Sequence, residues 1–426
     1  MPRSIKCGFI LAVFLFAAVS ARAQLTIDIV GGAGTTIPIS IVPFDGDGGG
    51  PAAVSSIVAA DLARSGLFKM IDGSAISPRP QRATEVRVGD WRAQGADAVV
   101  VGTMRPQPDG RADVRFDLVD TVKQQTLASQ SYLIGVNQTR ATAHRIADVI
   151  YEKLTGDKGV FSTRIAYVTK QGPRFQLVVA DADGADPQTV VSSNEPILSP
   201  KWSPEGTRLA YVSFEQKKPI VYVQNMSTGK RAAIANFRGS NSSPAWSPDG
   251  RQLAVTLTRD GNSQIFVMNA EGGNVRRVMN SPGIDTEACY TPDGQSLLFT
   301  SDRGGSPQIY RLNIASGAVE RVTFDGSYNV SPRALPDGKG IVFVRRDGGR
   351  FQIAIMDYAT RQTQVLTQGP DDESPSIAPN GKMILYANEG GGRGTLAAVS
   401  SDGRVKQRLS ASALDVREPA WGPLPQ

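Results

Sequence analysis

From about residue 165 onward, short apolar runs alternate with polar turns at a nearly constant spacing. Each run is rich in β-branched and aromatic residues and is bounded by turn residues, which is typical of a β-strand. The clearest runs occupy residues 209–213, 253–257, 297–301, 341–344 and 384–387. The turns carry prolines at Pro204, Pro248, Pro292, Pro336, Pro379 and Pro423. These prolines are 44, 44, 44, 43 and 44 residues apart, and a period in this range indicates a repeat architecture.

One period holds four strands. The first strand ends at the turn, where proline presets φ and an Asp-Gly or Asn-Gly pair supplies positive φ, and the second strand follows at once. A third strand, such as 264–269, and a fourth, such as 276–278, complete the unit. Four strands per period is the size of a β-propeller blade.

The two ends of the array predict closure into a ring. Residues 165–169 lie 44 residues before the run at 209–213 but have no proline turn ahead of them. The missing first strand stands at the other end, where residues 418–423 repeat the first-strand sequence. Five whole blades and one shared blade make six, and closure removes open sheet edges. An open solenoid is the alternative, but solenoids do not split one unit across the termini. We therefore predict an all-β six-bladed propeller over residues 158–426.

The pattern changes between residues 24 and 157. Apolar runs are interleaved there with two stretches, 52–65 and 140–154, whose apolar residues recur at the spacing of one helical face. The apolar runs occupy residues 37–44, 98–102, 114–119 and 131–135. This composition predicts a small α/β domain of normal size over residues 24–157, with residues 156–159 as the hinge into the propeller. Residues 24–35 are expected to form a flexible N-terminal tail of this domain.

Residues 1–23 have the pattern of a secretory signal. Arg3 and Lys6 precede an apolar stretch from Phe9 to Val19, and the small-residue site 21–23 predicts cleavage after Ala23. The stretch is shorter than the roughly 20 residues that a membrane span needs, which disfavours the alternative of an anchor. We expect an exported, periplasmic protein that is monomeric and has no transmembrane segment when mature.

Removal of the signal lowers the formal charge from +6 to +3, so no nucleic-acid partner is predicted. It also leaves Cys289 as the only cysteine, which rules out an intramolecular disulfide and suggests a thiol packed in a blade.

Candidate catalytic chemistry is sparse. The chain has one histidine, His144, which lies in a predicted helix and is more simply explained as structural. No Gly-x-Ser-x-Gly motif occurs, and the glycines of 32–36 lack the third glycine of a dinucleotide fingerprint. Residues 181–186 resemble the start of a calcium loop but lack the closing glutamate, so a turn is the better interpretation. We predict no catalytic, cofactor-binding or metal-binding residues, and no enzymatic activity.

The remaining candidate is a binding surface at the mouth of the propeller channel. Pairs of mostly small, hydroxylated or charged residues stand in equal register before each first strand, where the innermost strand of a blade borders the channel. These pairs are Leu198-Ser199, Ser242-Ser243, Thr286-Glu287, Val330-Ser331, Glu373-Ser374 and Arg417-Glu418. The competing interpretation is that they only cap backbone groups.

Taken together, these features resemble the TolB family, the periplasmic component of the Tol-Pal envelope system, over essentially the whole mature chain. The most specific motifs are Ile-Val-Gly-Gly at 29–32, Ile-Pro-Ile at 37–39, Ala-Asp through Tyr-Glu-Lys-Leu-Thr-Gly at 147–156, and Asp-Glu-Ser-Pro-Ser-Ile-Ala-Pro-Asn-Gly at 372–381. The Trp-Ser-Pro-Asp-Gly turn alone would be a weak signal, because many propellers share it.

The resemblance implies a non-enzymatic adaptor that binds the lipoprotein Pal through the propeller and the inner-membrane protein TolA through its N-terminal extension. In the family this system supports outer-membrane integrity and envelope constriction during cell division, and bacteriocins are further partners to consider. The implied TolA contacts are Gln24, Leu25, Ile27, Ile29, Val30, Gly31 and Gly32. The implied Pal contacts, with the mouth positions, are Ser240, Asn241, Ser243, Thr286, Glu287, Ser331, Glu373, Ser374 and Glu418.

The resemblance has three further implications for the Pal contacts, for calcium and for coupling between the two partners. The family member compared most closely has a histidine where Ser240 stands. The resemblance also allows calcium in the channel, although no ligand set is evident. Pal binding and display of the tail would be coupled, which requires a differential affinity between two states.

Two other functional classes remain open from the sequence. A periplasmic hydrolase or lyase would need several histidines or carboxylates at the mouth, where only Glu287, Glu373 and Glu418 qualify. A saccharide-binding propeller would be expected to carry aromatic residues among the mouth pairs, which contain none.

Overall fold

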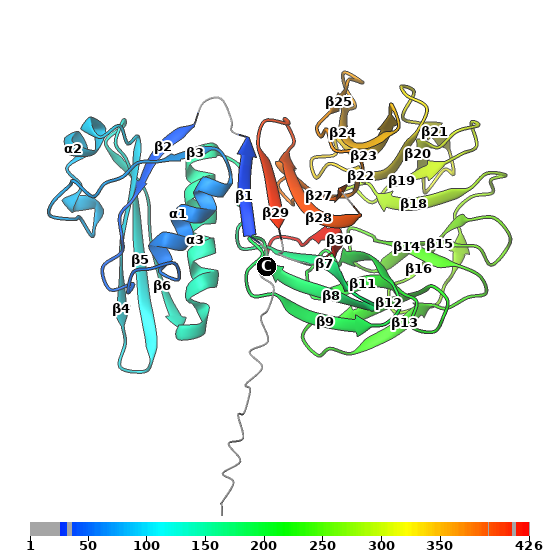
Figure 1. The fold of residues 1–426 in the computed structure, drawn as a ribbon, viewed down its shortest axis with the longest axis horizontal. Helices are drawn as coiled ribbons and strands as arrows, with labels where there is room; N and C mark the ends of the chain where they lie inside the picture. The colour runs from blue at the N-terminus through cyan, green and yellow to red at the C-terminus, as the bar shows by residue number, and fades with distance from the viewer. Residues whose placement is uncertain (1–25, 32–35, 391, 411–414, 426) are drawn as a thin grey trace, which may run out of the picture.

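The computed structural model describes residues 26–31, 36–390, 392–410 and 415–425. The expected signal peptide and the tail residues Gln24, Leu25 and Gly32 lie outside these ranges. An α/β domain lies beside a ring of small sheets, and two helices of the domain stand between its own sheet and the ring (Figure 1). No helix of the described residues is long and apolar enough to span a bilayer.

The α/β domain has a five-stranded sheet in the order β3-β2-β4-β5-β6. Strand β2 runs parallel to both β3 and β4, whereas β4, β5 and β6 are antiparallel to one another. The strands are β2 (Ile37–Ile41), β3 (Phe68–Met70), β4 (Ala98–Pro106), β5 (Arg111–Asp120) and β6 (Gln125–Gly135). The helices are α1 (Val54–Arg64), α2 (Val88–Ala93) and α3 (Thr139–Thr155), with 3-10 turns η1 (Ala83–Glu85) and η2 (Val136–Gln138).

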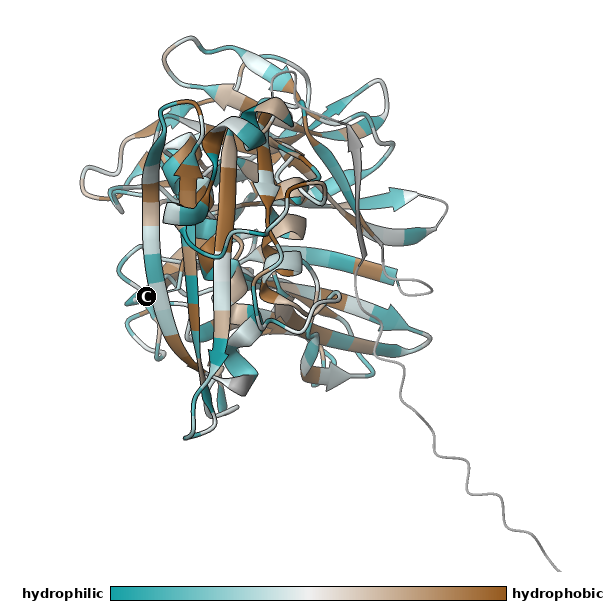
Figure 2. Cartoon of the chain, turned by 90° about the vertical axis from the view of Figure 1, so that its left-hand side faces the viewer, coloured by the Kyte–Doolittle hydropathy of each residue, from teal (hydrophilic) through white to brown (hydrophobic). Residues whose placement is uncertain are grey.

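Helices α1 and α3 are the two that the apolar spacing predicts. The apolar faces of both helices pack in one core with the sheet. Leu62 of α1, Ile146 of α3 and Phe116 of β5 are fully buried in this core. The central strands of the sheet carry apolar stretches, which Figure 2 shows in brown, and the first half of β4 is buried throughout. A second, smaller core on the other face surrounds Trp91 of α2.

The ring consists of six blades, each with four antiparallel strands. Blade one is β30 (Asp415–Trp421), β7 (Arg164–Gln171), β8 (Arg174–Asp181) and β9 (Gln188–Ser193). Blade two is β10 (Ile197–Trp202), β11 (Arg208–Ser213), β12 (Ile220–Asn225) and β13 (Arg231–Ala235). Blade three is β14 (Asn241–Trp246), β15 (Gln252–Leu257), β16 (Gln264–Asn269) and β17 (Arg276–Arg277). Blade four is β18 (Asp285–Tyr290), β19 (Ser296–Ser301), β20 (Gln308–Asn313) and β21 (Val319–Arg321). Blade five is β22 (Asn329–Ala334), β23 (Gly340–Asp347), β24 (Arg350–Asp357) and β25 (Thr363–Val365). Blade six is β26 (Asp372–Ile377), β27 (Met383–Gly390), β28 (Arg393–Ser400) and β29 (Lys406–Ser410).

The fold class and the closure of the ring are confirmed. The C-terminal strand β30 pairs with β7, with Ala420 opposite Ala166 and Trp421 opposite Ile165. The first blade therefore takes its innermost strand from the end of the chain, as the split repeat predicts.

Blade six carries a fifth strand that the sequence did not predict. Strand β1 (Thr26–Gly31) lies antiparallel to β29 on the outer edge of this blade, with Ile27 opposite Leu409. The sequence predicts a flexible tail for this segment. An outer strand exposes unpaired backbone groups, and a neighbouring extended segment can satisfy them. The N-terminal segment thus lies against the propeller, in the gap between the ring and α1 (Figure 1).

The linker between the domains is held at both ends. Helix α3 ends at Gly156 in the left-handed conformation, with φ of 81°. The Lys158 carbonyl accepts a hydrogen bond from Asn380 Nδ2 at 2.8 Å, and Lys382 Nζ lies 2.9 Å from Asp157 Oδ2. The proline turn of blade six therefore holds the linker in place.

Candidate binding site

The innermost strand of every blade has the same irregularity near its start. A β-bulge interrupts its pairing with the second strand, and one residue in the bulge takes a positive φ. These residues are Ser199 (52°), Ser243 (48°), Glu287 (56°), Ser331 (55°), Ser374 (53°) and Glu418 (53°). Left-handed backbone is uncommon outside glycine, and bulges re-aim side chains next to functional sites. The repeat thus builds a ring of six such residues.

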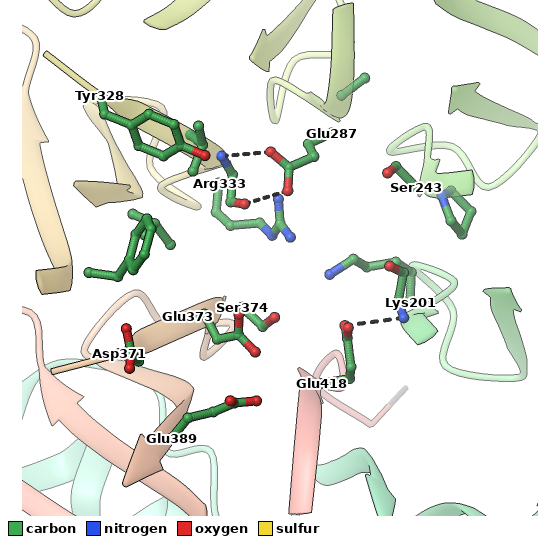
Figure 3. Close-up of a pocket in the computed structure, with 17 residues that line it drawn as sticks. Lys201, Ser243, Glu287, Tyr328, Arg333, Asp371, Glu373, Ser374, Glu389 and Glu418 are labelled. Carbon is green, nitrogen blue, oxygen red and sulfur yellow. Dashed lines mark hydrogen bonds between the residues drawn. The ribbon is translucent and has the colours of Figure 1, made fainter. Parts of the chain in front are cut away.

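All six left-handed residues line one cavity of about 590 Å³ at the mouth of the channel (Figure 3). We call them the mouth ring. The cavity wall also includes Tyr328 and Phe351, whose rings pack edge to face with centroids 5.8 Å apart. The mouth pairs identified in the sequence contain no aromatic residue, so these two reach the cavity from other positions of blade five.

Two glutamates of the mouth ring connect neighbouring blades. Glu287 of blade four accepts hydrogen bonds from the Ser331 hydroxyl at 2.5 Å, from the Ser331 amide at 3.1 Å and from the Thr300 hydroxyl at 3.0 Å. Glu418 of blade one accepts a hydrogen bond from the Ser199 amide at 3.1 Å. Both therefore cap backbone groups of the next blade, which was the competing interpretation of the mouth pairs.

Two basic residues line the channel next to the mouth ring. Lys201 and Arg333 each follow a mouth-ring serine by two positions, in blades two and five, which face each other across a six-bladed ring. They line both the mouth cavity and a second cavity of about 320 Å³ further along the channel. Burial and repulsion by Arg333 lower the pKa of Lys201, whereas Glu418 and Glu287 oppose that shift. Burial raises the pKa of Glu418, against the opposing effect of Lys201.

Blade six contributes an acidic side to the mouth. Asp371, Glu373 and Glu389 lie along one wall of the cavity (Figure 3), and Glu389 is paired with Arg417. Enclosure by the wall and repulsion by Glu418, Glu389 and Asp371 raise the pKa of Glu373 to about 7. The mouth therefore combines the carboxylates of blade six, the serine hydroxyls of the mouth ring and the basic side chains of Lys201 and Arg333.

Most of the residues named from the sequence meet at this cavity. Ser243, Glu287, Ser331, Glu373, Ser374 and Glu418 line it, whereas Ser240, Asn241 and Thr286 do not. Asn241 is fully buried, and its Nδ2 donates to the carbonyl oxygens of Pro219, Phe237 and Gly239. Its position in the structure is that of a loop-capping residue. Thr286 is half-buried, with its hydroxyl 3.4 Å from that of Thr256, and Ser240 lies in the loop ahead of β14.

Lys201 and Arg333 are functional candidates that were not predicted from the sequence. At their repeat position the other blades carry small residues, namely Ala245, Cys289, Ser376 and Ala420. A basic residue at a repeat position that is small in the other blades was therefore the sequence signal that could have identified them. Cys289 is half-buried and lines the second cavity.

The tail residues lie elsewhere. Ile27, Ile29, Val30 and Gly31 belong to β1, on the outer edge of blade six, and Gln24, Leu25 and Gly32 lie outside the described residues. His144 also lies outside the channel, on α3, where its Nδ1 is 2.5 Å from Asp61 Oδ2 of α1.

Comparison with known proteins places both domains. The family model described as the TolB amino-terminal domain matches residues 25–127, and the one described as the TolB beta propeller domain matches residues 151–425. The chain is 68% identical over 404 residues to the Tol-Pal system protein TolB of Aromatoleum aromaticum, covering 95% of this chain and 94% of that protein. It is 60% identical over 414 residues to that of Methylobacillus flagellatus, covering 96% of each. A crystal structure of TolB from Acinetobacter baumannii aligns with a TM-score of 0.88 at 42% identity, over 94% of this chain and all of that one.

Proposed function

The chain belongs to the TolB family of Tol-Pal system proteins, and we propose that it is a non-enzymatic periplasmic adaptor. In this proposal the lipoprotein Pal binds at the mouth of the propeller channel, and TolA binds the N-terminal segment, residues 24–32. The adaptor would thereby support outer-membrane integrity and envelope constriction during division. The observation that carries the first part is the mouth ring, six left-handed residues that line one polar cavity.

The mouth suits a protruding segment of a protein partner. A cavity of about 590 Å³ is in the range of small-ligand pockets and is too small to admit a folded domain, so a domain would insert one loop and contact the rim. Apolar side chains stand exposed beside this polar centre, with Leu198 next to the mouth ring and Ile284 just before β18. Leu198 is 36% exposed and Ile284 is 49% exposed. Exposed apolar groups around pre-formed hydrogen-bonding groups are a usual composition for a protein interface.

The N-terminal segment suits a different kind of partner. Among the described residues strand β1 pairs with β29 alone, so its other backbone edge has no strand partner. A partner could add a strand to this edge, or it could bind the segment after release from β29. In the second case docking on β29 competes with TolA. Any partner that binds the docked and released states with different affinity would then regulate display of the segment.

The experiment for the Pal site is a calorimetric titration of the protein with the soluble domain of a cognate Pal. The informative variant is Ser243→Glu, because glutamate already occupies the same left-handed position in blades one and four. The Ser243 hydroxyl has no hydrogen bond to any residue that the structure describes, so little stability should be lost. Ala315→Glu, in an exposed turn between β20 and β21, adds the same side chain elsewhere and serves as the control.

Saturable one-to-one binding that Ser243→Glu weakens by at least about tenfold, and that Ala315→Glu leaves unchanged, would support the proposed site. Equal affinity of all three proteins would remove the mouth from the Pal interface. The titrations are repeated with calcium and with a chelator, since we propose that binding needs no cofactor.

The TolA proposal is tested by deleting residues 24–35 from the mature form of the chain. The deletion should abolish TolA binding in the same assay and leave Pal binding intact, because the mouth ring lies on other strands. A folded deletion variant that still binds TolA would contradict the assignment of this segment.

A further inference from the structure

Helices α1 and α3 meet the turn after β8 across the domain interface. The turn carries Asp181 and Asp183, and the helices carry Arg64, Arg140 and His144. Arg140 Nε lies 2.9 Å from Asp181 Oδ2, and its Nη2 is paired with Asp183. Arg64 Nη1 lies 3.7 Å from Asp183 Oδ2. The turn that resembles a calcium loop in the sequence is thus enclosed by basic residues of the other domain.

The histidine of this cluster is incompletely paired. Its side chain is only 2% exposed, and Nδ1 lies 2.5 Å from Asp61 Oδ2, which is also buried. Its Nε2 is buried and has no hydrogen-bond partner among the described residues. The nearest acidic oxygen, Asp181 Oδ2, is 3.8 Å away. A buried polar atom without a hydrogen-bond partner lowers the stability of the fold, so the orientation of Nε2 needs a chemical explanation.

A metal ion would satisfy this atom. His144, Asp181 and Asp183 offer one nitrogen and two carboxylate oxygens that all lie within 4.8 Å of one another. Imidazole and carboxylate are ligands of zinc and related divalent ions, and three protein ligands leave a position for water. A carboxylate that holds the other ring nitrogen, as Asp61 holds Nδ1, is the usual support of a histidine ligand. We propose that His144, Asp181 and Asp183 bind a divalent transition-metal ion such as Zn²⁺ between the two domains.

Arg140 is the competitor for this site. Its guanidinium now neutralises the two carboxylates that the ion would use, so a metal must displace it. The ion must also displace the proton on His144 Nε2, because a metal-bound imidazole is neutral, so the metal affinity is set by competition with both Arg140 and the proton. Because His144 comes from the α/β domain and the aspartates come from blade one, a bound ion would join the domains through coordinate bonds in place of ion pairs.

The test uses Zn²⁺ calorimetry and the visible absorption of Co²⁺ on the untagged protein. His144 is the only histidine of the chain, so a cobalt spectrum of nitrogen and oxygen ligation can arise from no other imidazole. The proposal predicts one-to-one binding that Arg140→Gln strengthens by about tenfold, because the competing cation is removed. Asp183→Asn should weaken it by about tenfold or more, in the range for altered metal sites.

The matched control is Asp186→Asn in the same turn, where the side chain is 73% exposed and lies 3.9 Å from Arg140 Nε. It should leave the metal affinity unchanged. If neither the wild type nor Arg140→Gln binds one equivalent, or if the cobalt spectrum shows thiolate ligation from Cys289, the proposal is overturned. A purely structural cluster would be weakened by Arg140→Gln and would gain no metal affinity, so folding defects cannot imitate the expected result.

Discussion

Replacement of Asp61 by asparagine tests the charge of the buried histidine at the domain interface. Burial by itself would lower the pKa of His144, but the interactions with Asp181 and Asp61 outweigh it and raise the pKa from 6.5 to about 9. The charged groups around the ring are Asp61 and Arg64 of α1, Arg140 of α3, and Asp181 and Asp183 of the propeller turn. Asparagine keeps an oxygen that can accept from Nδ1 but removes the negative charge.

The magnitude follows from proton linkage. A histidine with a raised pKa contributes stability that is complete below its unfolded pKa of 6.5 and is lost as the pH rises through 9. At 1.36 kcal/mol per pKa unit this contribution is at most about 3 kcal/mol. Asp181 contributes the larger side-chain interaction, so Asp61→Asn should lower the free energy of unfolding by only part of this amount, about 1–2 kcal/mol near pH 6, and by clearly less near pH 10. A residual cost remains at high pH, because Arg64 Nη2, 2.8 Å from Asp61 Oδ1, loses the charge of this partner at every pH and keeps only the longer pair with Asp183.

The assay is hydrogen exchange of the amides of α1 and α3 at both pH values, in the presence of a chelator. It reports the opening free energy of this domain even where the two domains do not unfold together. Asp186→Asn, which removes an exposed carboxylate of the same turn, should change the opening free energy little at either pH. A cost of Asp61→Asn that is the same at both pH values would refute the reasoning, because it would show that His144 is not charged through Asp61.

Two further substitutions test the linker and the mouth. Gly159→Ala should lower the unfolding free energy by about 2 kcal/mol or more in urea denaturation, because the added Cβ would overlap the Asp148 backbone, whereas Gly89→Ala, with open space around it, should be nearly neutral. If both substitutions lowered the unfolding free energy by a similar amount, the linker would have moved to make room for the added Cβ. Glu287→Gln should cost about 1–2 kcal/mol by thermal unfolding, because the carboxylate accepts three hydrogen bonds from the next strands. An unchanged melting temperature would indicate that these bonds are not important for stability. Because Glu287→Ala would remove the same bonds, it would confound binding with folding and is a poor test of Pal binding.

The repeat made much of the propeller predictable, because each proline turn marks two strands and the period transfers them to every blade. The strands Arg208–Ser213 and Gln252–Leu257 begin within one residue of the apolar runs that predict them. The mouth was predictable for the same reason, since Ser243 and Glu287 stand at equal repeat positions. Asn241, two positions before Ser243, shows the limit of this reasoning, because the repeat does not say whether a polar side chain faces the channel or caps a buried loop.

Contacts between distant segments were beyond the sequence pattern. Strand β1 pairs with a strand nearly four hundred positions later, and a six-residue segment that ends in a glycine has no local reason to be ordered. The cluster of Asp61, His144 and Asp181 joins two helices and a turn of different domains. Nothing in the spacing of these residues indicates their proximity, because the relative position of the two domains creates it.

The mouth ring is a fixed binding surface, whereas the contacts at the domain interface can change. The mouth ring is part of β-bulges within the sheets and is cross-linked between blades by Glu287 and Glu418, so its shape is set by the propeller itself. The domain interface is different. There Gln407 of β29, the strand that holds β1, donates a hydrogen bond to the Arg64 carbonyl, and Arg64 also pairs with Asp183. A change in the charge or metal content of the interface cluster therefore acts on the helix that supports β29, whereas, within the described part of the chain, no mouth-ring residue forms a hydrogen bond or ion pair with that helix. We expect regulation of this protein to act at the interface and to leave the geometry of the mouth unchanged.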